Sequence, residues 1–459
     1  MKRKSPRSAD GKVRAAFSRF RKRVSRYTLN KEGAKRLGED VEQGMNYLGD
    51  RLDTAIEPMD PIYTEPVHRK PTRSEASPDT VLTRGPVDYY FLFIVIALCL
   101  FGAVMAFSAS SVYAAQYHDD PAYYVKRHII YLALAAVVTV PFVLKSRPWF
   151  WRFFGVASYV GSVLLLLLVL IIGSSYGSGA TRWIQIGPVS IQPSEIAKMA
   201  VILCIALVMT KYERQIRARQ KFGGQFVYGV LYPMAIFGFI CLLVVFEHHL
   251  SGIIIIGLMG LVCMYLGGTD KKWFLWLFAI GAVAIVLVLM VSEYAVLRIT
   301  TWLQIEFNSP GLNPLGSAWQ TLQGLNAIGS GGFFGRGLGN SQQKYGYVSQ
   351  PQNDFIFTII CEELGFVGAL AVILLFGLLI WRGFRIAAKA PDKFCSMVVY
   401  GLVIKVALQA ILNIAVVTNS IPNTGIALPF FSSGGTSLIL QIFEMGIILS
   451  ISRYSYQKR

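Results

Sequence analysis

The chain has 459 residues, of which 54% are hydrophobic and 15% are charged, and its formal net charge is +18. A soluble domain carries roughly 25% charged residues, so the composition excludes an ordinary soluble globular protein. Apolar runs of about 18 or more residues recur along the chain, and each is long enough to cross a hydrocarbon core of roughly 30 Å. The sequence therefore predicts an all-α, polytopic membrane protein.

The first 36 residues hold most of the positive charge, because they contain 14 Lys or Arg and only 2 acidic residues. Five prolines between residues 58 and 78 then favour an extended linker. We predict that residues 1–86 form a disordered cytoplasmic tail, followed by a transmembrane domain over residues 87–459. As a partner for the tail, the anionic membrane surface is favoured over nucleic acid, and a solvated extension that only helps to set topology is the simpler alternative.

We expect ten transmembrane helices, near residues 88–115, 127–145, 150–173, 194–211, 226–247, 251–268, 273–292, 354–382, 395–418 and 435–453. In this arrangement the connections rich in Lys and Arg all fall on one side of the membrane, together with both ends of the chain. Because lysine and arginine concentrate in cytoplasmic loops, the pattern predicts that both termini lie in the cytoplasm.

Two connections on the opposite side are long, at about residues 174–193 and 293–353. Loops of this length in a compact domain are usually functional or disordered. Trp183, Trp302 and Trp319 favour packing onto the bundle or the lipid interface over disorder. We expect the second loop to be the largest non-helical segment outside the tail, and the chemistry of the protein to face outward.

The first outer loop leads into a polar helix start, with the sequence GATRWIQIGPVSIQPSEIAK over Gly179–Lys198. Pro193 occupies a first-turn position that helices favour. Glu195 and Lys198 are three residues apart, so they share one helix face near the outer membrane boundary. They form either an interfacial ion pair beside a Trp183 anchor or part of an outward-facing binding site.

The second outer loop is rich in glycine and ends at a lone carboxylate, Asp354, where a polar loop runs into an apolar helix. Ionisable groups at or inside a bilayer are costly, so this residue is a functional candidate. No strand is predicted before the glycines, which excludes a dinucleotide-binding fingerprint. Arg336 and Lys344 are candidates for binding phosphate or, equally, solvated loop charges. We expect Glu362 and Glu363 two turns deeper than Asp354.

The last outer loop, Asn419–Ser437, contains prolines and glycines that indicate a broken, re-entrant path. Such a path is tolerated at membrane depth only where it is buried in protein or lines a cavity. By helix rise, Lys405 and Glu444 lie near the bilayer midplane. An isolated charge at that depth costs a few kcal/mol, so we expect Lys405 to pair with Glu444. The alternative partners are Glu362 and Glu363.

Taken together, these segments resemble one bacterial family, the SEDS proteins typified by FtsW, RodA and SpoVE. The resemblance covers residues 88–453 and rests on Gly-Ala-x-Arg-Trp and Gln-Pro-Ser-Glu-x-x-Lys in the first outer loop, on the run that leads to Asp354, and on Leu-Pro-x-x-Ser-x-Gly-Gly-x-Ser in the last. The positions that depart from the family pattern are His248, His249, Gln352, Asn353 and Ser433.

The resemblance implies a peptidoglycan glycosyltransferase that polymerises lipid II into β-1,4 glycan strands at the outer face of the cytoplasmic membrane, for septal or spore wall synthesis. An α-linked sugar pyrophosphate that yields a β-linked product favours a single inverting displacement. That step needs a base for the acceptor hydroxyl and positive charge for the departing pyrophosphate. A retaining glycosidase would instead need two carboxylates roughly 5 Å apart.

By the resemblance, Asp354 is the catalytic base. The expected substrate-binding residues, which include the cations that would face the pyrophosphate, are Arg182, Trp183, Glu195, Lys198, Gln320, Arg336, Lys344, Ser432 and Ser437. No tightly bound cofactor is implied, and a divalent cation, Mg²⁺ or Mn²⁺, is a candidate additional source of positive charge. The expected partners are lipid II, a class B penicillin-binding protein transpeptidase and other division proteins.

Two other functional classes stay open. One is a flippase that moves lipid II across the bilayer, which the mid-membrane charges favour, and the other is a division scaffold that only holds partner proteins. Within the family, the Leu-Pro-Phe-Phe-Ser-Ser-Gly-Gly loop favours the FtsW or SpoVE branch over a RodA-like elongation enzyme. Substitution of Asp354 separates the classes, because polymerisation needs that carboxylate whereas transport and scaffolding need not.

Overall fold

A computed structural model describes residues 80–173, 182–186, 189–218, 224–247, 249–291, 293–306, 315–316, 318–432 and 435–458. All of these belong to one compact unit. Among them, nine helices are long and apolar enough to cross a membrane. The predicted all-α, polytopic membrane architecture is therefore confirmed.

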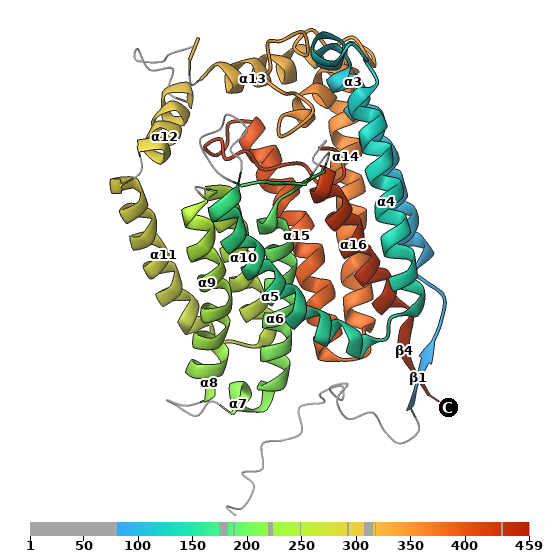
Figure 1. The fold of residues 1–459 in the computed structure, drawn as a ribbon, viewed down its shortest axis with the longest axis vertical. Helices are drawn as coiled ribbons and strands as arrows, with labels where there is room; N and C mark the ends of the chain where they lie inside the picture. Colours follow the sequence, from blue (N-terminus) through green and yellow to red (C-terminus); the bar gives the residue numbers. More distant parts are fainter. Residues whose placement is uncertain are drawn as a thin grey trace, which may run out of the picture. The chain divides into compact units, whose positions relative to one another are not determined.

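The spanning helices begin and end close to the predicted positions (Figure 1). They are α3 (Tyr89–His118), α4 (Tyr123–Lys145), α5 (Pro148–Ile172), α6 (Pro193–Lys211), the continuous run of α8 (Gly224–Phe226), the π-helical turn η1 (Val227–Leu231) and α9 (Tyr232–Phe246), then α10 (Leu250–Gly267), α14 (Ile356–Lys389), α15 (Lys393–Val417) and α16 (Gly435–Ser452). At the remaining predicted position lies α11 (Lys271–Val291), whose sequence has no charged residue after its two lysines.

Local sequence signals set several helix ends. Asp88 caps α3, because its carboxylate accepts a hydrogen bond from the Phe91 N–H at 3.0 Å. Asp392 caps α15 in the same way through the Cys395 N–H at 2.7 Å. Pro193 opens α6, at a position where the missing N–H of proline costs no helical hydrogen bond.

The second outer loop is not the non-helical segment that we expected. It contains α12 (Glu293–Glu306) and α13 (Trp319–Gly331), which lie at the same end of the bundle (Figure 1). Both helices mix polar and apolar residues, so they lack the long apolar run that identifies a spanning helix. The first outer loop contains a hairpin of β2 (Ile184–Ile186) and β3 (Val189–Ile191).

Part of the predicted tail pairs with the end of the chain. Residues 1–79 lie outside the described residues, but β1 (Thr80–Arg84) pairs antiparallel with β4 (Tyr454–Lys458). The Gly85 N–H also donates to the Arg453 carbonyl at 2.7 Å. The segment just before α3 is therefore joined to the end of the chain by backbone hydrogen bonds.

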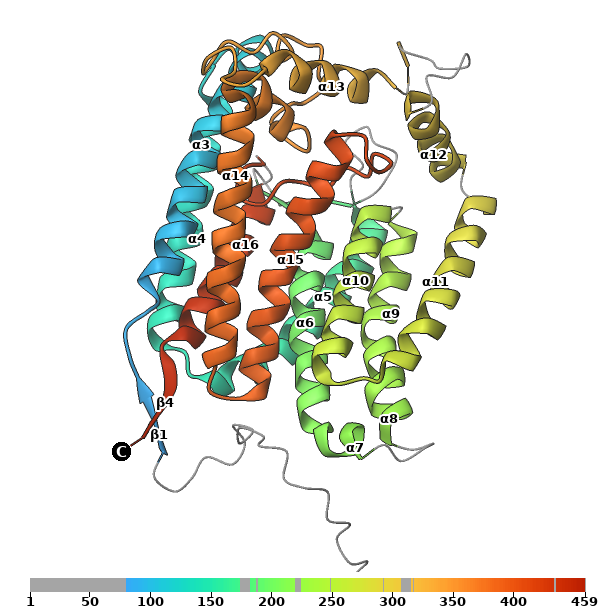
Figure 2. The same ribbon diagram turned by 180° about the vertical axis from the view of Figure 1, so that it is seen from behind.

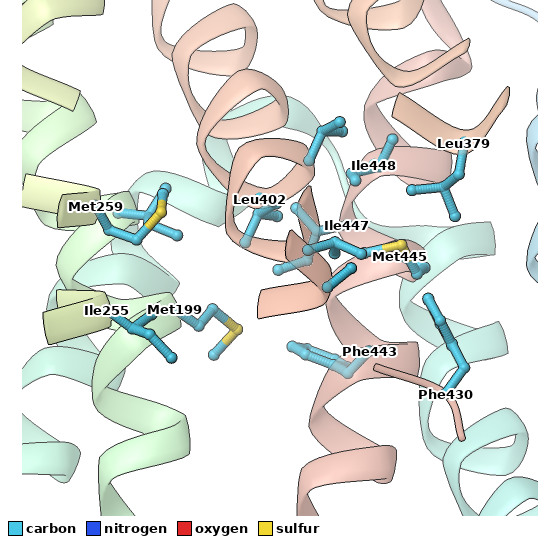
Figure 3. Close-up of a cluster of buried hydrophobic side chains, with 14 of the residues drawn as sticks. Met199, Ile255, Met259, Leu379, Leu402, Phe430, Phe443, Met445, Ile447 and Ile448 are labelled. Carbon is cyan, nitrogen blue, oxygen red and sulfur yellow. The ribbon is translucent and has the colours of Figure 1, made fainter. Parts of the chain in front are cut away.

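The core lies among α6, α10, α15 and α16. Figure 3 shows part of it, with Met199 of α6, Ile255 of α10, Leu402 of α15 and Ile447 of α16. In α6, 72% of the residues in the spanning window are buried, against 22% in α5. In consequence α6 lies at the centre of the bundle, whereas α5 lies at its periphery, with about half of its residues exposed.

Helices α13 and α14 cross at close backbone contact. A Cβ at Gly331 would lie 1.9 Å from the Cys361 carbonyl oxygen, and one at Gly335 would lie 2.2 Å from that of Glu363. Gly365 interrupts α14 with φ 66° and ψ −160°, which glycine adopts without steric cost. α14 therefore consists of a short segment before Gly365, packed on α13, and a long segment after it, which runs through the bundle (Figure 2).

Candidate active site

Asp354 lies two residues before α14, and its backbone is fixed by other elements. The Asn413 side-chain amide, on α15, donates to the carbonyls of Asp354 and Ile426, both at 2.7 Å. The Ser432 hydroxyl donates to the Asn353 carbonyl at 2.7 Å. Asn413 is fully buried. Its two hydrogen bonds join the residues just before α14 to the last outer loop.

The Asp354 side chain is half-buried beside that loop. Gly425 has φ 65°, and a Cβ added there would lie 3.4 Å from Asp354 Oδ2, so the loop backbone passes close to the carboxylate. Burial raises the pKa of Asp354, while its own backbone N–H and the Arg298 guanidinium oppose that rise. A carboxylate whose pKa is raised toward the working pH is a more effective general base.

Arg298 belongs to α12, which closes one side of an outer cavity of about 210 Å³ between α12, the start of α13 and the last outer loop. Arg298 Nη1 donates to the Asn423 carbonyl. The Trp302 indole N–H donates to the Asn419 carbonyl at 2.8 Å. These bonds hold α12 against the last outer loop. Gln320, a predicted substrate-binding residue, lines the same cavity.

Glu195 and Lys198 form a second group, inside the bundle. Lys198 Nζ lies 2.6 Å from Glu195 Oε1, and the side chains are only 3% and 12% exposed, so this pair faces protein rather than lipid. Lys405 also interacts with Glu195. Lys405 Nζ lies 2.6 and 2.7 Å from the two Glu444 carboxylate oxygens. The predicted Lys405–Glu444 pair is therefore confirmed.

Arg182 is half-buried two residues before β2, and its charge acts on Glu247 and His249. Glu247 is fully buried, and neither of its carboxylate oxygens has a hydrogen-bond partner within the described ranges. Burial raises the pKa of Glu247 to about 8, against an opposing effect of Arg182. Lys198 also acts on His249. The predicted cations Arg182 and Lys198 thus both act electrostatically on His249, whereas the cation that acts on Asp354 is Arg298 of α12.

The remaining predicted binding residues lie in different surroundings. Trp183 is half-buried at the start of the hairpin, and Ser437 is half-buried in the first turn of α16. Ser432 is 6% exposed and bonds to the backbone beside Asp354, so it positions the site.

Lys344 and Arg336 are directed at acidic residues of α14. Lys344 Nζ lies 3.1 Å from Glu363 Oε1, with both side chains at most 2% exposed. Arg336 Nη1 lies 3.9 Å from Glu362 Oε1. Glu362 also accepts hydrogen bonds from the Ser341 hydroxyl at 2.5 Å. These two cations therefore fasten the glycine-rich loop onto the short segment of α14.

Our expectation that Glu362 and Glu363 lie two turns deeper than Asp354 is wrong, because it assumed one continuous helix that descends from Asp354. The backbone breaks at Gly365, and the segment before the break packs against α13 and the glycine-rich loop. The Ser108 hydroxyl of α3 also donates to the Glu363 carboxylate, at 2.6 and 2.7 Å from its two oxygens.

Sequence reasoning missed two residues at the site, Arg298 and Asn413. A signal for Arg298 was available, since it is the one cation in the otherwise mixed segment EYAVLRITTWLQIE. Asn413 is a lone amide within the apolar run of α15, and buried amides need hydrogen-bond partners. Within the described residues, no group of three His, Cys, Asp or Glu side chains gathers in a metal-binding arrangement.

Comparison with known proteins places this geometry in a family. The family model described as "Cell cycle protein", FTSW_RODA_SPOVE, matches residues 89–457. Stage V sporulation protein E of Bacillus subtilis (strain 168) is 37% identical over 386 residues, which cover 84% of this chain and 99% of that protein. A probable peptidoglycan glycosyltransferase FtsW of Trichlorobacter lovleyi is 35% identical over 80% of this chain and 93% of its own length.

Solved structures agree with this assignment. A chain of a peptidoglycan synthase complex has a TM-score of 0.63 and 25% identity, and the match covers 80% of this chain and 98% of that one. The rod shape determining protein RodA of Thermus thermophilus has the same fold, with a TM-score of 0.57 at 24% identity over 80% of this chain and 97% of its own. From its sequence, its helices and these matches, the chain belongs to the FtsW/RodA/SpoVE family of membrane proteins.

Proposed function

We propose that the chain polymerises lipid II into β-1,4 glycan strands at the outer face of the cytoplasmic membrane, with both termini in the cytoplasm. Curated relatives that cover most of this chain are named peptidoglycan glycosyltransferases, and one is a sporulation protein. The concentration of Lys and Arg in the loops opposite Asp354 supports the orientation. The reaction class is glycosyl transfer in cell division or sporulation.

The observation that carries the proposal is the setting of Asp354. It is a half-buried carboxylate with a raised pKa, on a backbone fixed by Asn413 and beside an Arg298 that lines an outer cavity. In an inverting displacement, the Asp354 carboxylate takes the proton from the acceptor sugar hydroxyl as that oxygen attacks the anomeric carbon. The pyrophosphate leaves on the opposite side of that carbon.

Arg298 is the residue that we assign to the departing pyrophosphate. Lys344 is a weaker candidate than the sequence suggested, because Glu363 neutralises it in a buried pair. Arg298 lines the cavity, and a guanidinium can bind two phosphate oxygens at once. Gln320, on the same wall, would contact the sugar or the peptide of the substrate. A divalent cation would supply further positive charge to the departing pyrophosphate, and we keep it as part of the proposal.

A transpeptidase partner is also proposed. One similar structure belongs to a peptidoglycan synthase complex that coordinates polymerization and crosslinking. We infer that this chain works with a class B penicillin-binding protein. That protein would crosslink the strands as they emerge.

Asp354→Asn tests the proposal, since the amide keeps the shape but cannot accept the proton. Purified protein with its cognate transpeptidase and fluorescent lipid II should lose polymer by a factor on the order of 100 or more. The matched control is Asp120→Asn, a solvent-facing carboxylate paired with Lys126 at 2.8 Å in the turn between α3 and α4. Near-native polymerisation by Asp354→Asn would refute the base, and lipid II transport in vesicles by that variant would favour a flippase.

A further inference from the structure

The other end of the bundle carries a second cavity, of about 320 Å³, where α3 begins and α14 and α16 end. It is distant from the proposed active site. The Ser396 hydroxyl of α15 donates to the carbonyl of Ala387, beside this cavity, at 2.8 Å. Asn413, which holds the Asp354 carbonyl, lies 17 residues further along the same helix, or about 25 Å. The two sites therefore do not share a ligand.

Three cations and one carboxylate line this cavity, so its charge is unbalanced. Arg382 is committed to Asp88, with contacts of 2.8 to 3.0 Å. Arg385 and Lys389 are exposed, and neither has a carboxylate partner among the residues that the structure describes. Arg385 lies over the ring of Trp381, 4.4 Å from its centroid, which orients its guanidinium. Two positive charges thus remain for a ligand.

The residues around the cavity place it at the level of lipid headgroups. Tyr89, Tyr90 and Trp381 are 66%, 73% and 52% exposed, and such aromatic side chains gather at membrane–water interfaces. One turn further into α3, Phe93 is 72% exposed, so the lipid-facing surface begins there. The apolar side chain of Ile386 contributes to the floor of the cavity. A ligand in this position would have a phosphate beside the cations and an apolar chain beside the helices.

We propose that this cavity binds the headgroup of an anionic phospholipid, with its phosphate held by Arg385 and Lys389. Basic pockets between transmembrane helices are a recognised form of anionic lipid site. Free phosphate offers the same charge but makes no use of the apolar floor, so the lipid is favoured. From the usual contribution of one cation at a lipid surface, removal of both charges should weaken binding about 20- to 30-fold.

Native mass spectrometry of the full chain, titrated with phosphatidylglycerol or phosphatidylcholine, tests this assignment. The wild-type protein should retain one more phosphatidylglycerol than phosphatidylcholine, and Arg385→Gln with Lys389→Gln should lose that lipid. The matched control is Lys271→Gln with Lys272→Gln, two exposed cations at the start of α11 and outside the cavity. This control should retain the lipid, as should the charge-preserving Lys389→Arg.

Three outcomes would overturn the proposal. Equal retention of the two lipids by the wild-type protein would show that the cavity does not distinguish an anionic headgroup from a neutral one. Equal loss in both double variants would place the lipid elsewhere on the protein. Displacement of phosphatidylglycerol by millimolar inorganic phosphate alone would make the cavity a phosphate site. The thermal midpoint of each variant, measured in the same detergent, separates lost binding from lost folding.

Discussion

Lys405→Met is expected to destabilise the protein strongly, because it leaves the Glu444 carboxylate buried without its partner. The two side chains are 1% and 0% exposed, and they meet at 2.6 Å. Breaking a buried pair from one side costs about 3–5 kcal/mol. Lys198 and Glu195 also act on Glu444, but with opposite signs, so they do not replace Lys405 and we expect a loss within that range. For a domain of roughly 350 residues that corresponds to a thermal midpoint lower by about 4–7 °C.

Differential scanning fluorimetry in detergent measures this shift, and two double variants complete the test. Lys405→Met with Glu444→Leu removes both charges and should recover most of the lost stability, because an apolar replacement of a buried pair is often neutral. Exchange of the two residues, Lys405→Glu with Glu444→Lys, should recover more than either single exchange. If the exchanged pair is no better than the single variants, the direct pairing does not stabilise the fold.

The matched control is the exposed pair of Lys126 and Asp120. It has a similar separation, 2.8 Å, but its side chains are 65% and 36% exposed. Exposed pairs contribute at most about 1 kcal/mol, so Lys126→Met should change the midpoint little. A shift as large as that of Lys405→Met would mean that loss of a lysine, rather than burial of a carboxylate, causes the effect.

Three further predictions concern the outer site. Gly331→Ala should impair folding and activity, because its Cβ would meet the Cys361 carbonyl at 1.9 Å, whereas Gly329→Ala, with nothing within 4 Å, should be tolerated in a thermal-shift and polymerisation comparison. Asn413→Ala should lower kcat by about tenfold or more with little change in KM, since it frees the backbone that positions the base; an unchanged kcat would exclude this positioning role. Glu247 has a pKa of about 8 in the folded chain and an ordinary value near 4.5 when unfolded, so the folded state holds the extra proton. Stability should therefore fall as the pH rises from about 5 to 8, and Glu247→Gln should flatten that slope in unfolding measurements.

The spanning helices were predictable because a bilayer imposes one simple requirement, a long apolar run. The Lys405–Glu444 pair was predictable for a related reason, since a charge at mid-membrane depth has few partners available. Helix α12 was not predictable, because its mixed composition resembles that of an ordinary loop. Arg298, which lies on this helix, was missed for the same reason.

The fate of Lys344 shows a different limit of sequence reasoning. Its residue type fits phosphate binding, and only the three-dimensional path of the chain shows that Glu363 neutralises it. That path depends on the break at Gly365, whose backbone conformation turns the short segment of α14 toward α13. A glycine in a helical pattern is common enough that the sequence alone does not distinguish a break from a tolerated residue.

The two helices that line the outer cavity, α12 and the start of α13, are attached to the bundle with unequal stiffness. Further along, the backbone at the end of α13 packs directly on the backbone of α14, so the helix that follows Asp354 has no room to slide. α12 is tied to the last outer loop only by side-chain bonds to carbonyl oxygens, worth about 1.5–3 kcal/mol for the charged Arg298 and about 1 kcal/mol for Trp302. An enzyme whose product lengthens at every cycle must make room repeatedly without losing alignment. We therefore expect the outer cavity to widen on the side of α12, while the backbone of Asp354 keeps its position.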